Sequence, residues 1–109
     1  MSYYVYLEVD TPSEGRTVVA WIGNYTSNVK RMWNRALPPD GIAMLDGKPA
    51  GRVARALRGA VERMERNRVE YEAMNPPDGW GNYEGALDYL RSLAEACAAH
   101  PTTTIRVAR

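Results

Sequence analysis

The chain has few of the residues that most catalytic and metal sites need. Its 109 residues include one cysteine, Cys97, one histidine, His100, and no phenylalanine. A single cysteine cannot form an internal disulfide, which fits a protein of a reducing compartment. One histidine and one cysteine, with no carboxylate at ligand spacing, do not make a zinc site. We therefore expect no metal and no cofactor.

Long hydrophobic runs and a strong net charge are also absent. No run approaches the roughly 18–20 apolar residues that cross a bilayer. Residues 1–8 show neither the basic start nor the small-residue cleavage site of a signal peptide. The net charge of +1 gives no general attraction to nucleic acid or to an anionic membrane. These absences predict a cytoplasmic protein with no membrane partner.

The motifs of common enzyme classes are missing as well. The sequence contains no G-x-S-x-G, no Walker pattern and no G-x-G-x-x-G. Cys97 and His100 are spaced so that they could touch on a helix, but no oxyanion-donor loop is near them. The neighbouring alanines favour Cys97 as a small buried hydrophobe. The sequence therefore favours a protein that is not an enzyme.

What is present is ordinary globular composition. Hydrophobic residues make up 45% of the chain and charged residues 25%, values typical of a folded domain. A chain of this length is one domain by the usual size range. We predict a single α+β domain over residues 1–109.

Three segments have the pattern of β-strands. Residues 3–9 alternate, with one face apolar and the other carrying Tyr4, Tyr6 and Glu8. A turn at 10–15 leads to a second β-rich segment at 16–22, which predicts a hairpin. Residues 102–107 form a last β-branched strand. The exposed tyrosines of the first strand would suit a protein partner or a homodimer surface.

Three segments have helical periodicity, each with one apolar stripe. The first begins near Thr26 or Ser27 and ends before the Pro38-Pro39 pair, the second runs from the turn at 46–49 to about Ala73, and the third follows Asn82 and ends at Pro101. The element order is therefore β-β-α-α-α-β. We predict a three-stranded antiparallel sheet with the first strand central and three helices packed on one face.

The topology predicts where a binding site would lie. If consecutive helices are antiparallel, the first and third helices begin at the same end of the domain. The polar-aromatic segments 23–28 and 75–83 lead into these two helices and should meet there. Free backbone N–H groups, amides and aromatic rings at that end would suit a small polar ligand or a peptide laid over Trp80.

The candidate ligand-binding residues come from both segments. They are Asn24, Tyr25, Thr26, Ser27, Asn28, Asn75, Asp78, Trp80, Asn82 and Tyr83. A purely structural interpretation stays open, because the same residue types form caps and turns. Under that interpretation Trp80 would plug the end of the core.

Two further functions stay open. Residues 30–68 carry ten Lys or Arg against four Asp or Glu, mostly on the helix over 48–68, which would suit weak nucleic-acid binding. Glu62 and Glu65 interrupt the arginines, however, and favour a solvated face with ion pairs. Asp78 and Glu84 could serve as acid and base of a small enzyme, although carboxylates at this place more often interact with a helix dipole.

Three stretches resemble small proteins of actinobacteria and of the phages that infect them. These are residues 3–9, residues 23–29 and residues 74–87, which begin Met74-Asn75-Pro76-Pro77. The resemblance covers nearly the whole chain. It implies a source of that kind and carries no activity and no functional residues. The expected function is a non-enzymatic binding module, a small accessory protein that engages a protein partner or a polar ligand.

Overall fold

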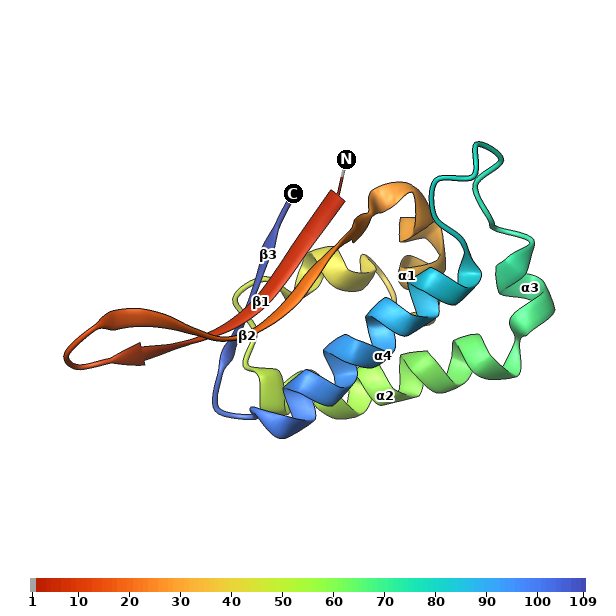
Figure 1. Ribbon diagram of the computed structural model, residues 1–109. Coiled ribbons are helices and arrows are strands. Elements are labelled where there is room, and N and C mark those ends of the chain that lie inside the picture. Colours follow the sequence, from red (N-terminus) through yellow and green to blue (C-terminus); the bar gives the residue numbers. More distant parts are fainter. Residues whose placement is uncertain (1) are drawn as a thin grey trace.

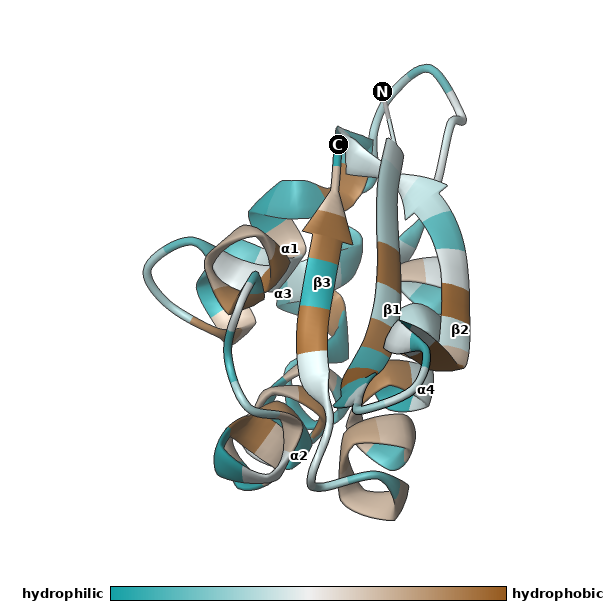
Figure 2. Cartoon of the chain, turned by 90° about the vertical axis from the view of Figure 1, so that its left-hand side faces the viewer, coloured by the Kyte–Doolittle hydropathy of each residue, from teal (hydrophilic) through white to brown (hydrophobic). Residues whose placement is uncertain are grey.

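A computed structural model describes residues 2–109 and shows two layers, a three-stranded sheet and a group of helices on one side of it (Figure 1). Figure 2 shows the same layers from the sheet side, with the strands in front and the helices behind. This is the predicted α+β architecture. The chain measures 48 × 26 × 20 Å, because the hairpin between the first two strands projects beyond the helices.

The sheet has the order β2-β1-β3, with both pairs antiparallel. The strands are β1 (Ser2–Thr11), β2 (Gly15–Thr26) and β3 (Thr104–Ala108). β1 is central, as the sequence predicted. Its inward residues, Tyr3, Val5 and Leu7, are buried against the helices.

β2 is longer than the sequence indicated, since residues 23–26 continue the strand instead of leaving it. The pairing with β1 shifts twice, which leaves Val19 and Ile22 as extra residues in β2. Gly23, with φ +92°, follows the second shift in a conformation that favours glycine. The bulges bend β2 and keep it paired with β1 up to Thr26.

Four α-helices and two short 3₁₀ helices form the second layer. They are, in order, η1 (Ser27–Val29), α1 (Lys30–Ala36), η2 (Gly41–Leu45), α2 (Ala50–Arg66), α3 (Arg68–Glu72) and α4 (Tyr83–Ala99). η2 occupies the short apolar run at 42–45, whose pattern predicts neither a helix nor a strand. The long helices α2 and α4 lie side by side (Figure 1).

The prediction of one helix up to Ala73 is wrong, because the chain breaks at Asn67. Asn67 has φ −120° and ψ 41°, outside the helical region. Its Nδ2 donates to the carbonyl oxygen of Arg63 at 2.8 Å, and its backbone N–H donates to the same oxygen at 3.1 Å. Asparagine is a weak helix former because its side chain bonds to nearby backbone in this way, so α2 ends at Arg66 and α3 begins in a new direction.

The core lies between the inner face of the sheet and α1, α2 and α4. The predicted apolar stripes of α1 and α4 are buried in full, and that of α2 is buried except for Val53. Trp33 is completely buried, and its Nε1 donates to the carbonyl oxygen of Ala86 on α4 at 3.0 Å. This bond joins two helices that are far apart in the sequence.

No helix covers the outer face of the sheet (Figure 2). Tyr4 is 49% exposed there, while Trp21 of β2 is 66% exposed and lies against Tyr6 with ring centroids 5.0 Å apart. Glu8 shares this face but is only 7% exposed, because Arg106 Nε donates to its carboxylate at 2.6 Å. The same hydrogen bond raises the pKa of Arg106.

Candidate functional site

The two polar-aromatic segments meet at one end of the domain, as the topology predicted. The hydroxyl of Tyr25 accepts a hydrogen bond from the backbone N–H of Asn82 at 3.2 Å. The Tyr25 hydroxyl also lies so close to Gly85 in α4 that no side chain would fit there. Tyr25 therefore links the end of β2 to the start of α4.

Tyr25 is part of an aromatic cluster beneath this end. Its ring lies 6.1 Å from that of Trp33 and 6.0 Å from that of Tyr89, measured between centroids. The Tyr89 hydroxyl donates to the carbonyl oxygen of Gly23 at 2.8 Å. Burial raises the pKa of Tyr89, so this phenol stays protonated and keeps donating. Tyr25 is thus a packing residue more than an open ligand contact.

Four other candidate residues make hydrogen bonds that shape the chain locally. Thr26 caps η1 through the N–H of Asn28, at 3.3 Å, and Asn82 caps α4 through the N–H of Gly85, at 2.8 Å. Asn75 Oδ1 accepts from the N–H of Tyr83 at 2.7 Å. Asp78 Oδ1 accepts from the N–H of Trp80 at 3.0 Å, which closes a tight turn.

Tyr83 is buried and unavailable to a ligand. It is 2% exposed, and its hydroxyl donates to the carbonyl oxygen of Met64 at 2.7 Å. The guanidinium of Arg68 lies 5.3 Å from the centre of its ring. Burial raises the pKa of the Tyr83 hydroxyl. Tyr83 therefore joins the start of α4 to the end of α2.

Asn24 and Ser27 lie away from the meeting point of the segments. Asn24 pairs with Tyr4 across β1 and β2, and the two exposed residues share the outer face of the sheet. Ser27 lines a small hollow of about 120 Å³ together with Tyr3, Lys30 and Arg109. These two candidates do not face the loop at 75–83.

A shallow hollow of about 290 Å³ does lie between the two segments. Asn28 and Arg31 line one side, and residues 73–78 line the other. Arg31 makes no ion pair with any residue in the range 2–109, and Asp78 on the opposite side is exposed. Asn28, Asn75 and Asp78 are among the candidates predicted from the sequence. Arg31 was predicted to lie on this helix but was not among the site candidates, because its position opposite residues 73–78 depends on the packing of distant segments.

Trp80 stands at the tip of the loop that borders this hollow. It is 71% exposed, so the interpretation that it plugs the core is wrong. The Asp78 turn shapes the loop, the bond between Asn75 and Tyr83 joins its two ends, and Asn82 is bonded to Tyr25 of β2. An exposed indole on a loop fixed in this way is a typical recognition feature.

The structure gives no support to an acid–base pair of Asp78 and Glu84. The Asp78 carboxylate accepts the backbone hydrogen bond that closes the turn. The Glu84 carboxylate accepts a hydrogen bond from Arg68 Nη2 at 2.6 Å. Arg68 also pairs with Glu72 at 3.1 Å, and these two carboxylates raise its pKa. Both carboxylates therefore have structural partners.

The remaining reactive groups point to no catalytic or metal site. Cys97 is completely buried, and burial raises the pKa of its thiol to about 11, which keeps it protonated. Within residues 2–109, no cluster of three His, Cys, Asp or Glu side chains could hold a metal ion. In the same range, no helix has the length and apolar character needed to cross a membrane.

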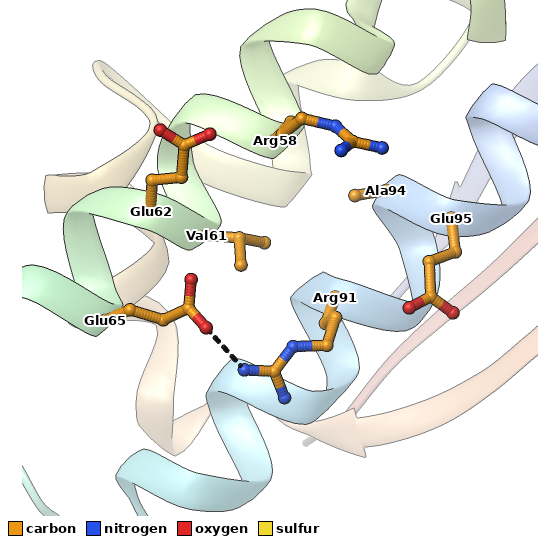
Figure 3. A pocket seen from close by; sticks show the side chains of 7 residues that line it. All are labelled: Arg58, Val61, Glu62, Glu65, Arg91, Ala94 and Glu95. Carbon is orange, nitrogen blue, oxygen red and sulfur yellow. Dashed lines mark hydrogen bonds and ion pairs between the residues drawn. The ribbon is translucent and has the colours of Figure 1, made fainter.

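The basic helix is only partly neutralised. Arg63 Nη1 donates to the carbonyl oxygen of Ala36 at 2.7 Å, so it supports the end of α1. Glu65 on α2 pairs with Arg91 on α4 at 3.0 Å (Figure 3). The other arginines of α2, which are Arg52, Arg55, Arg58 and Arg66, make no ion pair within the described chain.

A groove of about 280 Å³ runs between α2 and α4 (Figure 3). Val61 and Ala94 form its floor, and charges of both signs stand along its rim, among them Arg58, Glu62 and Glu95. The rim carries the carboxylates of Glu62, Glu65 and Glu95, and their negative charges oppose the binding of a polyanion. The groove therefore weakens the nucleic-acid hypothesis.

We expect only weak, salt-sensitive binding of nucleic acid by this helix. The double variant Arg55→Ala and Arg58→Ala should lose any binding of duplex or single-stranded DNA that the unaltered chain shows at low salt. The reason is that the helix offers few contacts to phosphate groups. At physiological salt neither the unaltered chain nor the variant should bind measurably. Fluorescence anisotropy of labelled DNA at the two salt concentrations measures this. Strong binding that persists at physiological salt and is lost in the variant would contradict the prediction.

Comparison with known proteins adds no guidance on function. No family model matches the chain, and searches of curated proteins and of solved structures gave no match. The candidate site must therefore be interpreted from its own residues. These are an exposed Trp80 on a fixed loop and a hollow with one cation, one carboxylate and amide groups beside it.

Proposed function

We propose that this chain is a non-enzymatic binding module that engages a peptide segment of a protein partner at the Trp80 loop. The observation that carries the proposal is the 71% exposure of Trp80 on a loop whose two ends are hydrogen-bonded in place. Burying an indole on binding gives a large favourable free energy, and a fixed loop loses little entropy when it binds.

The chemistry of the adjacent hollow favours a peptide over a charged small molecule. Arg31 and Asp78 line the same hollow, so an anion is attracted by one and repelled by the other. A peptide backbone is uncharged and offers both donors and acceptors, which the amide of Asn28 and the two charged groups can match. The hollow is also shallow and open to solvent, whereas ligand pockets enclose most of the surface of a small ligand.

Trp80→Ala should abolish peptide binding and leave the fold intact. Because the side chain is exposed, its loss should change the free energy of unfolding by less than about 0.5 kcal/mol. A displayed library of random linear peptides, selected on the unaltered chain, supplies the ligands. Titration of the selected peptides followed by the indole N–H signals in NMR spectra shows whether Trp80 is the contact.

Trp21→Ala is the matched control, because Trp21 is similarly exposed at 66% but lies on the outer face of the sheet. Selected peptides should bind this variant as they bind the unaltered chain. Failure to enrich any peptide, or peptides that still bind after Trp80→Ala, would refute the proposal. A large loss of stability in Trp80→Ala would show instead that the residue is structural.

A further inference from the structure

The two edges of the sheet are treated differently. The edge strand β3 is short and is covered by the loop before α2, where Pro49 forms a bridge with Thr104. Ile105 exchanges backbone hydrogen bonds with Gly47 and Lys48 at 2.8 and 2.9 Å, and Val107 N–H donates to Asp46 at 2.9 Å. This edge is closed.

The other edge, along β2, is open. Within residues 2–109, the backbone groups of residues 16–22 make hydrogen bonds only with β1. Further along, Gly23 accepts from Tyr89 and the Tyr25 side chain bonds to the loop before α4, so the open stretch ends there. At about every second position of residues 16–22 the backbone N–H and C=O groups therefore point away from β1, and they can pair with another strand.

The open stretch lacks most of the features that prevent edge pairing. It has no proline and no lysine, and Arg16 is its only charge. Its central residues are apolar, with Val19 41% exposed and Trp21 66% exposed. The bulges at Val19 and Ile22 bend the strand, but they place no charge on the edge. A row of this kind is a template for pairing with another strand.

The charge pattern favours a second copy of this chain as the occupant. An antiparallel edge is self-complementary, since a two-fold axis matches each N–H to a C=O of the other copy. A two-fold axis that passes between the Ala20 residues of the two copies places Val19 of each copy opposite Trp21 of the other. The same axis sets Arg16 opposite Asn24, so no like charges meet.

A nucleic acid fits this surface less well. Arg106 is held by Glu8, and Arg16 lies between Glu8 and Asp10 at 4.0 and 3.9 Å. These carboxylates neutralise the arginines beside the outer aromatic residues, so no cationic track follows the strand. A protein strand needs no such track.

We propose that two copies of this chain associate through their β2 edges about a two-fold axis, which joins the two sheets into one of six strands. The contact is formed by residues 18–22, which this axis pairs with one another, and Val19 and Trp21 form its apolar centre. Trp80 and the hollow beside it lie outside this contact, so the dimer and the peptide site are independent proposals.

Analytical ultracentrifugation of the full chain over a range of concentrations tests the dimer. The unaltered chain should approach twice its 12.2 kDa mass as the concentration rises. Val19→Lys should remain at the mass of one chain, because a lysine on an edge strand opposes its pairing with another strand. Trp21→Lys should behave in the same way, and circular dichroism shows that both variants fold.

Val69→Lys is the matched control, since Val69 is 84% exposed on α3, away from the sheet, and the chemical change is the same. It should dimerise as the unaltered chain does. Hydrogen exchange at residues 18–22 should slow as the concentration rises, and exchange elsewhere on the surface should not. A chain that stays monomeric at all concentrations, or a dimer that survives both lysine variants of β2, would overturn the proposal.

Discussion

Trp33→Ala is expected to lower the free energy of unfolding by about 3–5 kcal/mol, the range seen for a truncated buried aromatic. Trp33 is fully buried and lies within 5.7 Å of Tyr3 and 5.6 Å of Tyr89, measured between ring centroids. The variant also leaves the carbonyl oxygen of Ala86 without its indole donor. Chemical denaturation followed by circular dichroism gives the value.

The two other tryptophans serve as internal controls for this prediction. Trp21 and Trp80 are exposed, so at concentrations where the chain is monomeric the same truncation should change the free energy of unfolding by less than about 0.5 kcal/mol at either position. If all three variants lost similar stability, the placement of Trp33 at the centre of the core would be wrong. The contrast therefore tests the arrangement of the helices as well as one residue.

Gly85→Ala is expected to destabilise the protein by about 1–3 kcal/mol, the usual cost of overpacking. In most helices this change stabilises, because alanine is the better helix former. Here the new Cβ would overlap the hydroxyl of Tyr25. The tyrosine would have to move, which would break its bond to Asn82 and disturb its packing against Tyr89.

Gly59→Ala supplies the comparison with the opposite sign. Gly59 lies inside α2, and a Cβ there would meet no atom within 4 Å. The variant should gain about 0.5–1 kcal/mol, because the unfolded chain loses conformational freedom. Thermal unfolding of both glycine variants distinguishes the two effects. A gain in stability from Gly85→Ala would show that Tyr25 does not pack against α4.

Local patterns were sufficient to predict most of the fold. The alternation of Tyr3, Val5 and Leu7 identified the inner face of β1, and the apolar periodicity identified the core faces of the long helices. The caps at Thr26 and Asn82 were also identified from the sequence, because a cap is decided by residues a few positions apart. The expected antiparallel packing of consecutive helices also predicted that the two polar segments meet at one end of the domain.

The same reasoning failed where two local preferences compete. The helix break lies in the backbone of Asn67, with φ −120° and ψ 41°, and helical segments continue on both sides of it. The length of β2 depends on bulges that only pairing with β1 defines. Trp80 was assigned either to a site or to the core, since an aromatic residue in a loop is compatible with both.

The core-facing sides of the helices and strands could be predicted from the amino-acid sequence, because they follow from residues near one another in the chain. Which surfaces stay open depends on how distant segments pack. This packing buried Tyr83 and left Trp80 exposed, and it covered the β3 edge while leaving that of β2 free. Those outcomes depend on contacts between distant residues, such as Val107 with Asp46 and Tyr25 with Asn82, which no local pattern encodes.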